Sequence, residues 1–182
     1  MRRIVNIKCD TMINFKEMPL HSRVWVYQSI REFSENEITQ LKNKAEGFIS
    51  EWTSHGETMN ACIEIFHKRF IIVCVDEKTT SASGCGIDKS LKFIQQLESD
   101  LGGNTFLLDR MNVAYRKNAH LNNEVGQGEI TSCPISELKN VLTFPERQKG
   151  IIVFNNLVNT KAALERNWEV PLEKSWQYEK FI

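Results

Sequence analysis

The stretch FIIVCV at 70–75 constrains the fold most, because six consecutive apolar residues indicate a strand buried on both faces of a sheet. The run is too short to cross a membrane, since Asp76 and Glu77 follow it at once. A second apolar run, 59–66, precedes it, and His67-Lys68 between the two runs is typical of a hairpin turn. The sequence therefore predicts two neighbouring strands and no membrane-spanning segment.

Apolar periodicity before and after this hairpin predicts two amphipathic helices. Ser34 and Glu37 form a capping-box pattern, which begins a helix over about 35–52. A second helix extends from Ile87 to about 101, where two glycines supply the usual helix end. Further predicted elements are strands at 23–29, 111–116, 129–133 and 151–154, and helices at 137–142 and 160–168.

The order of these elements predicts the fold class. Up to residue 117 it is strand, helix, strand, strand, helix, strand, the split βαβ arrangement of a ferredoxin-like sandwich. We expect an α+β protein: a two-layer sandwich with a ferredoxin-like βαββαβ core, extended by a C-terminal strand and helix that continue the sheet. A three-layer α/β sheet is the alternative. Residues 12–182 are expected to form one domain, and 1–11 a poorly ordered tail or a stretch before a translation start at Met12.

Charge and cysteine content disfavour several classes of protein. The 23 basic residues balance the 23 acidic ones, so no net charge favours nucleic acid or an anionic membrane. The five cysteines are odd in number and include no C-x-x-C pair, which fits neither a disulfide framework nor a four-ligand zinc site. We expect a cytoplasmic protein without metal, cofactor or nucleic-acid partner.

The segment DEKTTSASGCGIDKS at 76–90 has features of an ATPase without the defining pattern. IIVCVDE looks like a magnesium-binding strand and GCGIDKS like a phosphate loop. A phosphate loop requires G-x-x-x-x-G-K-[ST], whose glycine before the lysine lets backbone N–H groups wrap the phosphates. Here Asp88 precedes Lys89, and the acidic strand runs directly into the loop. The motifs argue against an ATPase.

Several segments nevertheless resemble an uncharacterised bacterial family often catalogued as "ABC transporter ATPase". The resemblance spans about residues 12–182, although the loop at 118–128 is longer than is usual in the family. The catalogue name implies nucleotide hydrolysis, but the chain has neither an intact phosphate loop nor an LSGGQ-type signature. The similar segments are RVWVYQS, EWTSHG, RFIIVCVDE, SASGCGIDKS, DRMNVAY, IVFNNLVNTK and WEVPLEKSW.

Cys85 is the candidate nucleophile of the chain. It lies at or just before the start of the second predicted helix, where unpaired N–H groups and the helix dipole favour a thiolate. His55 is the candidate base and Asp76 the candidate carboxylate that orients it, because both lie next to the predicted hairpin. These residues support a thiol enzyme or redox sensor. Alternatively, Cys85 only fills a tight turn and His55 caps the preceding helix.

The same loop also supports an anion site without covalent chemistry. Hydroxyl groups, glycine N–H groups and a lysine at a helix start can cradle a phosphate or carboxylate. The loop residues that would hold the anion are Ser81, Ser83, Gly84, Gly86 and Lys89. Asp88, expected at the third helical position, is an alternative cap that would occupy the same donors.

Two more groups of polar residues are candidates for ligand contacts. The amides of Asn155 and Asn156 both donate and accept hydrogen bonds, although asparagine is also an ordinary turn residue. Arg69 and Arg110 are single candidates for an anion and are equally compatible with surface salt bridges. No pattern in the sequence decides between these roles.

The leading hypothesis is a binding protein. EWTSHG, residues 81–89 and FNNLVNT each border a predicted strand, so we expect them to enclose one pocket for a small anionic or polar ligand, or for a protein partner. Binding is favoured over catalysis. A structural protein with an exposed apolar patch near Trp176 and Phe181 is the third alternative.

Overall fold

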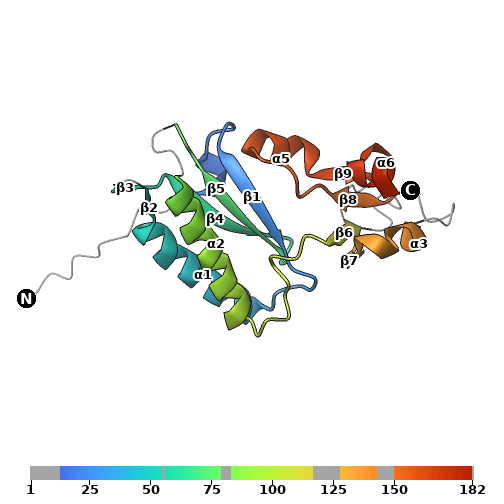
Figure 1. Cartoon of the computed structure of the whole chain (residues 1–182), viewed down its shortest axis with the longest axis horizontal. Coiled ribbons are helices and arrows are strands. Elements are labelled where there is room, and N and C mark those ends of the chain that lie inside the picture. Colours follow the sequence, from blue (N-terminus) through green and yellow to red (C-terminus); the bar gives the residue numbers. More distant parts are fainter. Residues whose placement is uncertain (1–12, 55, 79–82, 117–127, 143–149, 182) are drawn as a thin grey trace, which may run out of the picture.

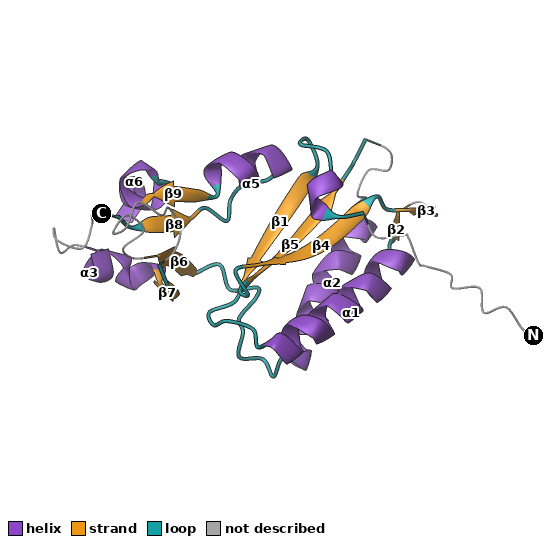
Figure 2. Cartoon of the chain, turned by 180° about the vertical axis from the view of Figure 1, so that it is seen from behind, coloured by secondary structure: helices purple, strands orange, loops and turns teal. Residues whose placement is uncertain are grey.

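The fold is α+β, as predicted, with two larger open antiparallel sheets and helices on the outer face of each (Figures 1 and 2). It is seen in a computed structural model, which describes residues 13–54, 56–78, 83–116, 128–142 and 150–181. The expected tail at 1–11 and most of the long loop at 118–128 lie outside these ranges.

The first sheet has the strand order β1–β5–β4 and contains the predicted hairpin. β5 (Phe70–Val75) is the apolar run, and all six of its residues are buried. It pairs antiparallel with β4 (Ala61–Phe66) on one side and with β1 (Arg23–Gln28) on the other. His67 and Lys68 form the turn, both with φ of 50°. The central place of β5 accounts for its lack of polar residues.

Two long helices cover one face of this sheet (Figure 1). They are α1 (Glu35–Glu51) and α2 (Gly84–Asp100). Phe48 and Phe93, one from each helix, stack with their ring centroids 4.3 Å apart. Trp52, directly after α1, is only 1% exposed and belongs to the same core.

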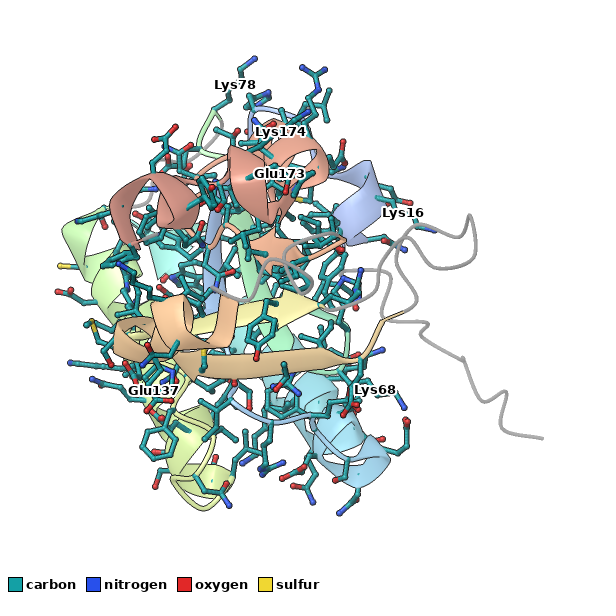
Figure 3. All side chains as sticks on the ribbon, turned by 90° about the vertical axis from the view of Figure 1, so that its right-hand side faces the viewer. Lys16, Lys68, Lys78, Glu137, Glu173 and Lys174 are labelled. Carbon is teal, nitrogen blue, oxygen red and sulfur yellow. The ribbon has the colours of Figure 1, made fainter. Side chains whose placement is uncertain are left out.

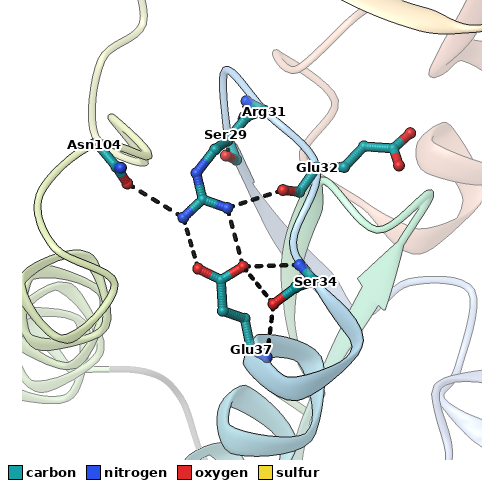
Figure 4. Close-up of polar contacts among 6 residues, drawn as sticks. All are labelled: Ser29, Arg31, Glu32, Ser34, Glu37 and Asn104. Carbon is teal, nitrogen blue, oxygen red and sulfur yellow. Dashed lines mark hydrogen bonds and ion pairs between the residues drawn. The ribbon is translucent and has the colours of Figure 1, made fainter.

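The start of α1 is held by the predicted capping box and by an arginine (Figure 4). The Ser34 hydroxyl accepts from the Glu37 N–H at 3.3 Å, and the Glu37 carboxylate accepts from the Ser34 N–H at 2.8 Å. Arg31 donates to both oxygens of Glu37, at 2.6 and 3.0 Å. Arg31 also donates to Asn104 in the segment after α2, so the network links the two helical units.

Replacing Glu37 by glutamine is expected to flatten the acid dependence of stability. Hydrogen bonds from Arg31 and Ser34 lower the Glu37 pKa to about 2. A carboxylate whose pKa is depressed by folding stabilises the protein above its unfolded pKa of about 4.3, and this contribution is lost as the pH falls toward 2. Glu37→Gln should cost about 1 kcal/mol at pH 7 and show a smaller fall in stability between about pH 4.5 and 2.

Urea denaturation at several pH values measures this effect. Glu51→Gln, an exposed glutamate at the other end of α1, is the matched control and should keep the wild-type profile. An unchanged pH profile in Glu37→Gln would show that the network does not stabilise the helix start.

The second sheet has the order β7–β6–β8–β9 and packs on the other face of the first sheet (Figure 2). Its strands are β6 (Asn112–Arg116), β7 (Ile130–Pro134), β8 (Ile152–Phe154) and β9 (Glu169–Pro171). Aromatic rings fill the space between the sheets: the centroids of Phe70 and Phe154 are 4.7 Å apart, and those of Phe70 and Trp168 4.9 Å. The far face of the second sheet carries α3 (Leu138–Leu142) and α6 (Trp176–Phe181), while α5 (Lys161–Asn167) contributes Leu164 to the core between the sheets.

The predicted fourth strand of the ferredoxin-like core is placed wrongly by the sequence analysis. β6 does not pair with β1; it is the second strand of the other sheet, which the C-terminal strands complete. β6 is buried on both faces, with Ala114 toward the first sheet and Val113 and Tyr115 toward the far side. The C-terminal elements thus build a second sheet instead of extending the first, and neither the two-layer sandwich nor the three-layer alternative describes the result.

Short elements that the sequence analysis did not predict complete the described chain. They are the two-stranded hairpin β2 (Thr53–Ser54) and β3 (Glu57–Thr58), the strand β9, the helix α6, and 3-10 turns at Phe15–Glu17, Ile135–Glu137 and Leu172–Lys174. All are shorter than the periodic patterns from which elements are predicted.

Surface charges of both signs are interspersed. Figure 3 looks onto the end of the molecule that carries α3 and α6, where Glu173 and Lys174 are neighbours and the labelled lysines are spread around the outline.

Within the described part of the chain, no helix is both long and apolar enough to span a membrane.

Candidate functional site

The start of α2 and the segment after α1 lie together, and hydrogen bonds join them. Ser83 is the N-cap of α2, and its hydroxyl accepts from the Gly86 N–H at 3.3 Å. The Ser54 hydroxyl donates to Ser83 Oγ at 3.0 Å and accepts from the Ser83 N–H at 3.3 Å. Trp52 Nε1 donates to the Gly86 carbonyl at 3.0 Å. These contacts fix the start of α2 to the segment that follows α1.

Several donors that an anion would need at this loop already make hydrogen bonds within the protein. The Gly86 N–H donates to the Ser83 hydroxyl, and Lys89 Nζ donates to the Thr53 carbonyl at 3.5 Å. Asp88 is the fifth residue of α2, so the helix is capped by Ser83 and not, as expected, by Asp88. Ser81 lies outside the described residues, and Gly84 is exposed at the first helical position. The anion site at this loop stays a prediction.

The thiol hypothesis also stays a prediction. Cys85 is exposed, as second residue of α2, but His55 lies outside the described residues. The Asp76 carboxylate contacts other residues. Its Oδ1 lies 2.9 Å from His21 Nε2 and accepts a hydrogen bond from the Lys78 N–H, while Oδ2 accepts one from the Asn60 side chain. The Lys78 N–H, followed by His21, lowers the Asp76 pKa. The histidine that meets this carboxylate is 55 residues away, and no sequence signal linked the two.

The structure also bears on metal binding and on the role of Arg69. The described residues contain no group of three histidine, cysteine or acidic side chains that could hold a metal ion. Arg69 is 6% exposed and donates to the carbonyls of Ile30 and Ile130, at 2.6 and 2.9 Å. Arg69 therefore links the segment after β1 to the start of β7 through buried hydrogen bonds, which is a structural role.

A cavity of about 260 Å³ lies beside the free edge of β1, where a ferredoxin-like fold would place its fourth strand. We call it the edge pocket. Besides β1, its walls are residues 107–110 of the segment before β6, the first β6 residues 112–113, Ile135, Phe154, residues 156–159 and residues 176–177. None of the described residues of 52–58 or 83–89 lines it. The three polar segments predicted to enclose one pocket therefore do not share this one.

The predicted asparagines belong to this pocket or to its support. Asn156 lines it, donating to Gln28 Oε1 at 2.7 Å and accepting from Trp168 Nε1 at 3.1 Å. Asn155 Oδ1 accepts from Trp176 Nε1 at 3.1 Å, which fixes one more wall residue. Sequence analysis found these amides but not Gln28, whose partner is 128 residues away.

The pocket combines an apolar interior with positive charge. Trp25 and Tyr27 present aromatic rings, and Arg23 lies 4.5 Å above the Trp25 ring while it contacts Glu77 at 3.3 Å. Both Tyr27 and Arg110 line the pocket; burial raises the pKa of Tyr27, and the charge of Arg110 offsets part of this rise. Arg110 is exposed at the wall of the pocket.

The acidic residue in the wall is already engaged. Asp109 Oδ1 accepts from the Met111 N–H at 2.7 Å, and its Oδ2 accepts from Asn112 Nδ2 at 2.6 Å. Arg23 already contacts Glu77, so Arg110 is the arginine of the wall that forms no ion pair with any described residue. Its positive charge favours an anion.

No protein-family model, curated protein or solved structure matches this chain. The resemblance to the family catalogued as "ABC transporter ATPase" thus rests on the sequence segments alone.

Proposed function

We propose that the protein binds a small organic anion with an apolar or aromatic body in the edge pocket. The observation that carries this proposal is that Arg110, which forms no ion pair with any described residue, lies at the wall of a largely apolar cavity of about 260 Å³ whose wall also contains the amides of Gln28 and Asn156. Small-molecule sites have this composition: mostly apolar walls and a few polar groups that orient the ligand.

Each part of the wall has a separate task in this proposal. Trp25 and Tyr27 contact the apolar body, because burying aromatic surface supplies most of the binding energy. Arg110 attracts the acid group of the ligand, since no ion pair to Arg110 exists within the described part of the chain. Gln28 and Asn156 hold each other in place and fix the width of the pocket. The volume of about 260 Å³ lies just below the range of about 300 to 1,000 Å³ that is usual for small-molecule pockets, so the cavity suits a small ligand.

Matched probes with one apolar body test the charge preference. Indole-3-acetate, indole-3-acetamide and tryptamine carry a negative, a neutral and a positive group, respectively. We expect indole-3-acetate to bind at least about fivefold more tightly than the amide, and tryptamine to bind most weakly, in titrations followed by two-dimensional NMR. Shifted signals should come from β1 and from residues 107–110 and 156–159.

Arg110→Glu is the decisive variant, with Arg166→Glu as its control. Arg166 is an exposed arginine of α5 that does not line the pocket, so both variants change the net charge equally. Arg110→Glu should weaken indole-3-acetate binding about tenfold or more, while Arg166→Glu should change it less than twofold. Equal affinity for all three probes, or equal loss in both variants, would refute the proposal.

A further inference from the structure

The outer edge of β1 offers backbone groups to the edge pocket. The Val24 N–H donates to the Asn159 carbonyl at 3.0 Å, away from β5, whereas the Ser29 N–H donates to Arg69, the residue before β5, at 2.9 Å. Backbone groups of alternate strand residues point to the same side. The N–H and C=O of Val26 therefore point outward, as those of Val24 do, and Val26 lines the pocket.

These two groups have no partner in the described part of the chain, although each neighbouring end of the edge is covered. At one end, Arg23 forms a bridge with Thr160. At the other, Gln28 Nε2 donates to the Asn112 carbonyl at 3.4 Å. Backbone donors and acceptors in a partly buried place normally find partners. Gln28 meets the second sheet through its side chain only, so the open stretch of the edge, which we call the window, begins after Val24 and includes the backbone groups of Val26.

We infer that the ligand is an N-acyl α-amino acid with an apolar side chain, which pairs with Val26 as a single strand residue would. In an antiparallel pair two opposite residues exchange both N–H···O bonds. The amide N–H of the ligand donates to the Val26 carbonyl, and its carboxylate accepts from the Val26 N–H. This inference rests on the proposed function and names the chemical class of its anion.

The surroundings of Val26 match the remaining parts of such a ligand. Trp25 and Tyr27 lie beside Val26 on β1 and give apolar surface for the side chain. Arg110 lines the same pocket as Val26 and adds positive charge that favours a carboxylate. A simple aromatic acid would use the rings and the arginine but leave the Val26 carbonyl unpaired.

Three probes separate this inference from the proposed function. N-acetyl-L-phenylalanine has the amide N–H, N-acetyl-N-methyl-L-phenylalanine lacks that proton, and 3-phenylpropionate lacks the amide. We expect the first to bind wild-type protein at least about tenfold more tightly than the other two, measured by calorimetry. Similar affinity for all three would overturn the role of Val26 and leave the proposed function standing. Binding of none would overturn both.

The last residue of any polypeptide is also an N-acyl amino acid, so the ligand could be a free small molecule or the C-terminus of a polypeptide. A peptide probe distinguishes these two sources. The bridge of Arg23 with Thr160 closes one end of the window, and the contact of the Gln28 side chain with Asn112 narrows the other, so a pentapeptide ending in phenylalanine should bind more weakly than N-acetyl-L-phenylalanine. Tighter binding of the pentapeptide would support the same pairing with a polypeptide C-terminus as the source, and would overturn the free amino acid as the ligand.

Val26→Pro removes the N–H that faces the pocket. Proline is tolerated in edge strands where the N–H points away from the sheet, which is the position of Val26. The variant should bind N-acetyl-L-phenylalanine about tenfold more weakly, with 3-phenylpropionate affinity changed less. An unchanged preference for N-acetyl-L-phenylalanine would contradict the pairing. If the variant does not fold, the wild-type probe comparison alone decides.

Discussion

Replacing Phe70 by alanine is expected to lower the free energy of unfolding by about 3 to 5 kcal/mol. Phe70 is 0% exposed at the start of the central strand β5. Its ring packs against those of Phe154 in β8 and of Trp168, the residue before β9, with centroids 4.7 and 4.9 Å away. Alanine removes this ring from both partners at once, and rigid strands on either side cannot close the cavity.

Urea denaturation of two controls calibrates the effect. Phe70→Leu keeps most of the volume and should cost no more than about 1.5 kcal/mol. Phe106→Ala removes the same atoms from a side chain that is 46% exposed and should cost less than about 1 kcal/mol. Because Phe154 lines the edge pocket, Phe70→Ala should also weaken indole-3-acetate binding. A loss below 1 kcal/mol would mean that the sheets are not held together by this ring.

Local patterns were sufficient for most individual elements. The six apolar residues of FIIVCV, ended by two acids, were sufficient to predict the central strand β5. Ser34 with Glu37 was sufficient to predict the start of α1 within one residue. The helical period of α2 is equally clear, although its start lies at Gly84 and not Ile87, because Ser83 caps it. These features depend on residues that are close in sequence.

The pairing of strand edges could not be predicted in this way. Periodicity shows which faces of a strand are apolar, but the neighbour of each edge depends on contacts between distant residues. β6 has apolar residues on both faces, Val113 and Ala114 among them, and would fit beside β1 equally well. Its place in a second sheet opens the edge of β1, so the edge pocket follows from the one connection that was predicted wrongly.

Replacing Glu169 by alanine is expected to cost about 3 kcal/mol, because it isolates a buried positive charge. The Arg116 side chain is only 4% exposed, and its Nη1 donates to Glu169 Oε2 at 2.7 Å. Arg116 Nε has no partner in the described part of the chain. His67 Nε2, from the β4–β5 turn, lies 2.7 Å from the other Glu169 oxygen, so Glu169 ties together both sheets.

The acid dependence gives this prediction a second readout. Burial alone would raise the Glu169 pKa, but the hydrogen bond with His67 and the charge of Arg116 lower it overall. The carboxylate therefore stabilises the fold above its unfolded pKa of about 4.3 and loses this effect as the pH falls below that value. Glu169→Ala should lack this part of the acid dependence.

The double variant Arg116→Met with Glu169→Leu separates a lost ion pair from a stranded charge. In the wild-type protein the Arg116 guanidinium carbon lies 5.5 Å from the centroid of the Phe154 ring. A methionine at position 116 can pack against the same ring and leaves no buried charge. The double variant should therefore be more stable than Glu169→Ala alone, by at least about 1 kcal/mol in urea denaturation at pH 7. If instead the double variant is the less stable of the two, the ion pair itself, and not the isolation of Arg116, holds this corner of the sheets together.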